Sequence, residues 1–196
     1  SSLKYHIMIE IIHRVNKIEN LEKIAFEKGV EIDIRSNNGS LVLSHDVSSK
    51  ADSFEEFIES YNHQLLVANI KEAGIEEEVI KTLQDNGISN FFLLDTEFPF
   101  IIKNHEEYGS VLSLRYSKLE SFKTIQNFIG KVKWVWVDTY KDFKINSEIA
   151  EVLENFSICL VSPSRWGNEK KLNYFIEKFS KFNLEISGVM IEEGEL

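Results

Sequence analysis

The chain has 196 residues, of which 43% are hydrophobic and 28% are charged. Its 32 acidic and 22 basic side chains give a formal net charge of −10, which disfavours binding to nucleic acid or to an anionic membrane surface. A lone cysteine, Cys159, excludes an internal disulfide and suits a reducing compartment. We therefore expect one cytoplasmic domain over residues 8–196 without membrane insertion. Residues 1–7 are expected to be a disordered terminus or an addition before a native start at Met8. The sequence leaves the oligomeric state open.

Eight short apolar runs recur along the chain, and each has the length and composition of a β-strand. Their hydrophobicity is nearly continuous rather than alternating, which is typical of parallel strands that are covered on both faces. The runs are Met8–Ile12, Val30–Ile34, Leu65–Ile70, Phe91–Leu94, Val111–Leu114, Val132–Val137, Ile158–Val161 and Ile186–Ile191.

Amphipathic stretches with helical spacing lie between these runs, at 21–25, 54–61, 75–83, 98–102, 119–129, 145–153 and 172–179. Ser53 is predicted to cap the N-terminus of the helix at 54–61, and Asn86-Gly87 are predicted to cap the C-terminus of the helix at 75–83. An Asn37-Asn38-Gly39 turn precedes a further apolar run, Leu41–Leu43, and predicts a short β-hairpin arm after the second strand. Eight strands alternating with helices predict an α/β fold, a compact (β/α)8 TIM barrel. An open doubly wound sheet is the alternative.

Polar residues stand where the predicted strands end, which is the end at which such barrels place their active sites. Two histidines, several carboxylates and several cationic side chains would then converge on one rim. In chain order these residues are His13, Arg14, Glu31, Asp33, Arg35, His45, Asp46, Asn69, Lys71, Asp95, Arg115, Tyr116, Asp138, Ser162 and Arg165.

Glu31 and Asp33 are two residues apart on one strand, so both carboxylates project to the same side. Two adjacent carboxylates repel unless a cation or basic groups lie between them. Oxygen ligands suit Mg²⁺ or Ca²⁺, and the alternative is neutralisation by Arg14, Arg35 or Lys71. His13 and His45 are candidates for a general base and a general acid, because an imidazole can take either role near neutral pH.

Four pieces of the sequence together resemble the signature of glycerophosphodiester phosphodiesterases. They are His13-Arg14, Glu19-Asn20, Glu31-Ile32-Asp33, and Gly39 followed by His45-Asp46. The chain is also similar to surface-polysaccharide-associated bacterial proteins through its His-Arg-Val-Asn, Asn-Ile-Lys and Val-Ser-Pro segments, which begin at His13, Asn69 and Val161.

The resemblance implies a barrel in which His13 and His45 form the acid–base pair and Arg14 grips the phosphate. It also implies that Glu31 and Asp33 hold a divalent cation, and that Lys71 matches the lysine of the family's Glu-x-Lys motif. Asn69 stands where the family has its third acidic metal ligand, and Asp95 on the next strand is the candidate to compensate. Val15 replaces the family's glycine after His-Arg.

The resulting hypothesis is a phosphodiesterase acting on a small glycerophosphodiester-like or sugar phosphodiester. Lys71, Arg14 and Arg115 would bind the phosphoryl oxygens. The leaving group would be met by Asn16, Asp95, Tyr116, Trp136 and Asp138, while specific roles for Ser162 and Arg165 stay open. One alternative is a catalytically inactive protein of the same fold that binds a phosphoryl ligand. Another is a barrel isomerase or lyase that acts on a sugar phosphate.

Overall fold

A computed structural model describes residues 8–48, 50–168 and 170–192 of the chain. The expectation for residues 1–7 lies outside the described residues. Within the described part, no helix is both long enough and apolar enough to cross a membrane.

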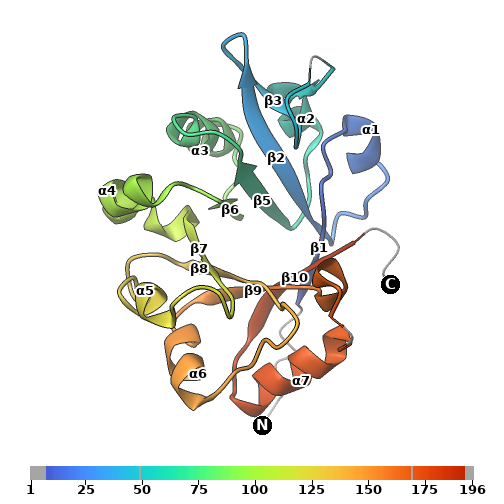
Figure 1. The fold of residues 1–196 in the computed structure, drawn as a ribbon. Helices are drawn as coiled ribbons and strands as arrows, with labels where there is room; N and C mark the ends of the chain where they lie inside the picture. The colour runs from blue at the N-terminus through green and yellow to red at the C-terminus, as the bar shows by residue number, and fades with distance from the viewer. Residues whose placement is uncertain (1–7, 49, 169, 193–196) are drawn as a thin grey trace.

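The centre of the fold is a mostly parallel sheet with helices around its outside (Figure 1). Its strands are β1 Ile9–Ile12, β2 Gly29–Asn37, β5 Leu65–Ile70, β6 Phe91–Leu94, β7 Ser113–Tyr116, β8 Trp134–Val137, β9 Ser157–Val161 and β10 Ile186–Ile191. β1 has a parallel neighbour on each side, β2 and β10. The sheet continues from β2 to β5 and β6 in one direction, and from β10 to β9, β8 and β7 in the other. The predicted α/β class and parallel sheet are confirmed.

β6 and β7 meet at the least regular point of the sheet. Their ladder is reduced to one parallel bridge between Leu93 and Leu112. The Ser113 hydroxyl supplements it by donating a 2.6 Å hydrogen bond to the Leu93 carbonyl. This side-chain bond satisfies a buried carbonyl that a regular ladder would have paired, so the contact between β6 and β7 rests on few groups.

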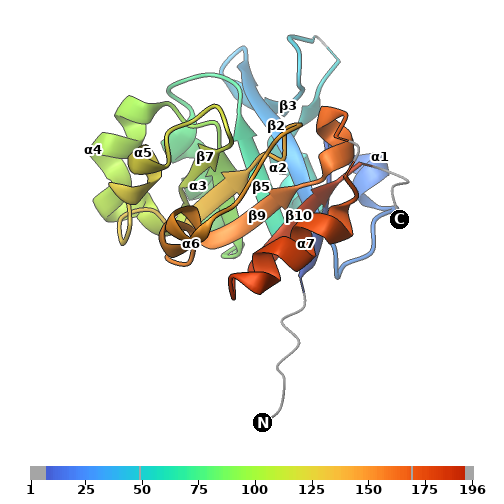
Figure 2. The same ribbon diagram turned by 60° about the horizontal axis from the view of Figure 1, so that its bottom comes forward.

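A hairpin extends from the end of β2. Gly29–Ile34 pair with β5, whereas Ile34–Asn37 pair antiparallel with β3, Ser40–Leu43. Asn38 and Gly39 form the turn with φ values of 51° and 80°, the backbone that an Asn-Gly hairpin turn requires. β4, Asp52–Ser53, adds to β3, and Figure 2 shows this arm rising beyond the sheet.

Seven α-helices occupy the connections in the described residues: α1 Ile18–Leu21, α2 Phe54–Ser60, α3 Glu76–Asp85, α4 Phe98–Tyr108, α5 Phe122–Gln126, α6 Ser147–Leu153 and α7 Leu172–Lys181. Ser53 caps α2 by accepting the Glu56 amide, and Gly87 follows α3 with a φ of 74°. The prediction for 21–25 was wrong, because α1 is a single turn that ends where that stretch begins. α5 is likewise shorter than predicted, and α4 is longer.

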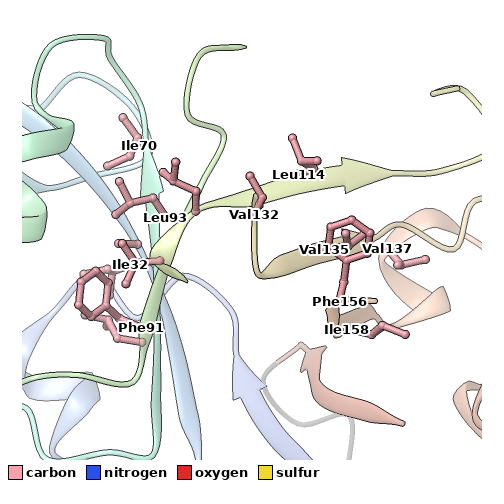
Figure 3. Packing of buried hydrophobic residues seen from close by; sticks show 14 of the residues in the cluster. Ile32, Ile70, Phe91, Leu93, Leu114, Val132, Val135, Val137, Phe156 and Ile158 are labelled. Atoms are coloured by element: carbon pink, nitrogen blue, oxygen red, sulfur yellow. The ribbon is translucent and has the colours of Figure 1, made fainter. Parts of the chain in front are cut away.

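The core has two layers because alternate residues of each strand face opposite sides of the sheet. One layer packs between the sheet and the helices, and Figure 3 shows Ile32, Ile70 and Leu93 of three neighbouring strands in it. The other fills the inner face, where Phe92 stacks on Trp134 with ring centroids 4.5 Å apart. Cys159 lies in this inner layer, where burial raises the pKa of its thiol, as expected for a structural cysteine.

Asp52 ties the hairpin arm to α1. Its carboxylate accepts the Ile18 amide at 2.9 Å, at the first turn of a helix that lacks a cap of its own, and pairs with Lys17 Nζ at 2.8 Å. Partial burial alone would raise the pKa of Asp52, but these hydrogen bonds outweigh it and lower that pKa. The ionised carboxylate therefore stabilises the fold above its unfolded-state pKa of about 4, and this contribution disappears as the pH falls through the lower folded-state pKa.

We predict that Asp52→Asn lowers the free energy of unfolding by about 1 kcal/mol at pH 7 and by progressively less below about pH 4. Urea unfolding at several pH values measures this, with the exposed Glu27→Gln as the control. An equal loss at pH 7 and pH 2.5 would contradict the electrostatic explanation.

Candidate active site

A polar cavity lies at the carboxyl ends of the strands and gathers residues from most of the chain. Most of the side chains that line it are polar or charged, and a few apolar residues complete the lining. The lining residues are His13, Arg14, Glu31, Asp33, His45, Asn69, Lys71, Leu94, Asp95, Arg115, Trp136, Asp138, Val161, Arg165, Trp166 and Met190. The cavity therefore contains both proposed catalytic histidines, all four proposed metal ligands and four of the six proposed substrate-binding residues, namely Arg14, Lys71, Arg115 and Trp136. The other two, Asn16 and Tyr116, do not line it.

His13 directly follows β1 and is held from two sides. Its Nδ1 lies 3.2 and 3.3 Å from the two carboxylate oxygens of Glu192, and its Nε2 lies 3.8 Å from Glu31 Oε2. Burial of the imidazole lowers the pKa of His13, although Glu192 opposes this shift. Because a carboxylate can only accept, the proton of neutral His13 belongs on Nδ1, which leaves the Nε2 lone pair available.

Arg14 has a left-handed backbone, with φ of 54°. This conformation is unfavourable for a residue with a side chain. Here it aims the Arg14 amide at Glu31 Oε2, 2.8 Å away. The buried carboxylate therefore holds the turn after β1, and the exposed Arg14 side chain lines the cavity.

Glu31 and Asp33 project into the cavity from β2 and are almost completely buried, at 2% and 1% exposure. Ile32 between them points to the outer layer, as strand alternation requires. Glu31 Oε1 accepts a 3.2 Å hydrogen bond from the Asn69 amide on β5. Burial, and next the charge of Asp33, raise the pKa of Glu31 to about 7.

Asp33 is fixed by Lys71 and Asn16. Lys71 Nζ lies 3.2 Å from Asp33 Oδ1, and Asn16 Nδ2 donates to Asp33 Oδ2 at 2.9 Å. The Asp33 amide returns a 2.8 Å hydrogen bond to Asn16 Oδ1. The expectation that Asn16 meets the leaving group is therefore corrected: both ends of its amide hold Asp33.

His45 enters the cavity from the segment after β3. Its side chain is 38% exposed, and its Nδ1 lies 3.0 Å from Asp46 Oδ1. Its carbonyl accepts from Arg35 Nε at 3.1 Å and Nη2 at 2.8 Å. Arg35 thus anchors the His45 backbone to the extended end of β2, and its guanidinium faces this carbonyl rather than the buried carboxylates.

Arg115 organises the part of the cavity formed by β6, β7 and β8. Its guanidinium binds both carboxylate oxygens of Asp95, and its Nη1 donates to Asp138 Oδ2 at 2.8 Å. Asp138 Oδ1 also accepts a 3.2 Å hydrogen bond from Trp166 Nε1. Burial raises the pKa of Asp138 against the opposing effect of Arg115. Asp95 is thus paired with Arg115 and does not lie where it would compensate for the neutral Asn69.

Trp136 lines the cavity as expected, whereas Tyr116 does not. Tyr116 is buried in the outer layer, with its ring 6.0 Å from that of Phe143. The physical reason is strand alternation: Arg115 and Tyr116 are consecutive, so only one of them can face the cavity. The expected role of Tyr116 in the leaving-group pocket is corrected accordingly.

Glu192 and Trp166 are site residues that the sequence reasoning missed. Glu192 follows β10, so the strand-end rule that found His13 would also have found it. Arg165 Nε lies 3.7 Å from Glu192 Oε1, which links the segment after β9 to the His13 pair. Trp166 closes the short 3₁₀ turn Pro163–Trp166 and gave no comparable signal. Ser162 is buried at the start of this turn, with its hydroxyl 3.1 Å from that of Ser164.

The contacts of Glu31 and Asp33 do not fit a resident divalent cation. Three of the four carboxylate oxygens accept hydrogen bonds from nitrogen donors of the chain, and Asn69 presents its NH₂ group to Glu31. The fourth oxygen, Asp33 Oδ1, accepts no hydrogen bond from the described residues but is paired with the Lys71 ammonium. Among the described residues, no three or more His, Cys, Asp or Glu side chains are grouped so that they could share a metal ion. Binding of Mg²⁺ or Ca²⁺ by Glu31, Asp33, Asn69 and Asp95 stays a prediction, and these contacts do not support it.

We predict that Asn16→Ala lowers the free energy of unfolding by about 1–3 kcal/mol, because it leaves the Asp33 amide and one buried carboxylate oxygen unpaired. Urea denaturation measures the change. Asn20→Ala, at an exposed position of α1, is the matched control. Equal stability of the two variants would show that Asn16 does not support Asp33.

Comparisons with known proteins place the fold. No protein-family profile and no curated protein sequence matches the chain. Among solved structures, a glycerophosphoryl diester phosphodiesterase from Parabacteroides distasonis matches with a TM-score of 0.62 and 12% identity, covering 97% of this chain and 84% of that one. A glycerophosphodiester phosphodiesterase from Agrobacterium tumefaciens matches with a TM-score of 0.61 and 9% identity, covering 95% and 96%. The chain therefore resembles the glycerophosphodiester phosphodiesterases in its fold, as its residue pattern predicted.

Proposed function

We propose that this chain is a phosphodiesterase that hydrolyses a small glycerophosphodiester-like or sugar phosphodiester on a (β/α)8-barrel scaffold. The observation that carries the proposal is the pairing of His13 with Glu192 in a cavity that also contains His45 and several cationic side chains. A carboxylate that fixes the tautomer of a buried imidazole is an arrangement suited to general-base catalysis.

Arg14 and Lys71 are the proposed phosphate-binding residues. Among the described residues, the Lys71 ammonium forms one ion pair, to Asp33, and it has three N–H donors to share. Arg14 presents a guanidinium whose fork matches phosphoryl oxygens. Arg115 contributes less than the sequence implied, because all three nitrogens of its guanidinium already donate to Asp95 or Asp138. Its proposed role is to fix the wall of the leaving-group pocket beside Trp136.

In the proposed reaction His13 Nε2 accepts a proton from the attacking water as its oxygen bonds to phosphorus. His45 gives a proton to the alcohol oxygen as the bond between that oxygen and phosphorus breaks. Arg14 and Lys71 offset the negative charge that develops on the phosphoryl oxygens. The products are a phosphomonoester and a free alcohol.

We predict that His13→Ala and His45→Ala each reduce turnover of bis(p-nitrophenyl) phosphate by about 10²–10⁴-fold, the usual contribution of a general acid or base. His105→Gln on α4 is the matched control, because it alters a histidine that does not line the cavity. Circular dichroism and thermal unfolding verify that each variant is folded.

Near-normal turnover in a folded His13→Ala or His45→Ala variant would refute the acid–base assignment. The alternative, an inactive protein that binds a phosphoryl ligand, makes a different prediction. In that case glycerol phosphodiesters would raise the melting temperature of the wild-type chain without any product being formed.

A further inference from the structure

We infer that the Glu31–Asp33 site works without a resident divalent cation, because donors of the chain itself occupy the place that such an ion would take. The catalytic half of this inference rests on the proposed function, whereas its ion-binding half can be tested without any turnover. Two buried carboxylates on one strand demand a partner of positive charge or several donors. The described residues supply both.

Three of the four oxygens of the carboxylate pair accept a hydrogen bond from a nitrogen, and the fourth, Asp33 Oδ1, is held by the Lys71 ion pair without a hydrogen bond in the described part of the chain. Glu31 accepts from the Arg14 amide at 2.8 Å and from Asn69 Nδ2 at 3.2 Å. Asp33 accepts from Asn16 Nδ2 at 2.9 Å and lies 3.2 Å from Lys71 Nζ. A cation bound here would have to displace these donors, and a displaced donor would be left without its acceptor inside a buried site.

The orientation of the Asn69 side chain also disfavours a cation at this site. Its side chain must turn either its NH₂ group or its oxygen toward Glu31 Oε1, and only the NH₂ group is attracted to a carboxylate. The amide therefore acts as a donor inside the cluster. Asn69 Oδ1 is left as a single neutral oxygen without a hydrogen-bond donor in the part of the chain that the structure describes. One neutral oxygen adds no charge with which to hold a hard cation.

The positive charge of Lys71 disfavours a cation as well. Its ammonium pairs with Asp33 and is largely buried, with 19% of the side chain exposed. A divalent cation between the carboxylates would lie next to this fixed positive charge and would be repelled by it. The two carboxylates and the single ammonium already form a cluster in which opposite charges are in contact. The site thus gains its positive charge from the protein rather than from an ion.

The decisive experiment is calorimetric titration of EDTA-treated protein with MgCl₂, CaCl₂ and MnCl₂ separately. We expect no saturable binding to the wild-type chain tighter than about 1 mM, the weak end of protein calcium sites. Asn69→Glu exchanges the neutral amide for a third carboxylate beside Glu31. This variant should bind at least one of the ions saturably, with a dissociation constant about tenfold or more below that 1 mM limit, because affinity follows the ligand charge.

Asn127→Glu, an exposed position after α5, adds the same charge away from the site and should leave ion binding unchanged. Turnover of bis(p-nitrophenyl) phosphate by the wild type should be equal in EDTA and in each salt. Stoichiometric binding of Mg²⁺, Ca²⁺ or Mn²⁺ by the wild type below 1 mM, or loss of turnover in EDTA, would overturn the inference. Absence of both binding and turnover would instead reject the proposed function and leave the ion-free site standing. If Asn69→Glu does not fold, the wild-type titration still decides.

Discussion

The buried carboxylate of Glu31 is the constraint on which the site depends. It accepts the amide of Arg14 from the turn after β1 and the side chain of Asn69 from β5, and His13 lies within 4 Å of it. Three neighbouring strands are thereby joined at their carboxyl ends through one side chain. The oxygens of a buried carboxyl group need hydrogen-bond donors, so the partners of Glu31 are fixed in place. The proposed base His13, the proposed phosphate-binding residue Arg14 and Asn69 of β5 are therefore positioned around the same carboxylate.

A second carboxylate system plays the equivalent role in the remainder of the cavity. Arg115 binds Asp95 on one side and Asp138 on the other, and Trp166 completes the pairing of Asp138. This system joins the ends of β6, β7 and β8, next to the place where β6 and β7 share a single bridge. Ion pairs at the rim thus supply connections that the backbone ladder provides only weakly below it.

Much of the site could be predicted because alternate residues of a strand point to opposite faces of the sheet, so the position of a residue in its strand shows which face its side chain is on. Glu31 and Asp33 face the cavity, as their spacing indicated, and the two histidines follow strands whose ends meet at one rim. Tyr116 was placed wrongly because the same alternation was not applied to its neighbour Arg115. Glu192 was missed because the last strand end was left out. Asn16 and Asp95 illustrate what strand position cannot supply, since their roles depend on which partner each side chain finds.

The claim that this cavity breaks a phosphodiester bond is tested most directly by product identification. Wild-type protein would be incubated with a panel of glycerophosphodiesters and sugar phosphodiesters, and the mixture followed by phosphorus NMR. The account predicts that the phosphodiester signal of at least one compound is replaced by that of a phosphomonoester. Unchanged phosphodiester signals throughout the panel, with clear thermal stabilisation by one of the same compounds, would contradict it and identify a binding protein built on an enzyme fold.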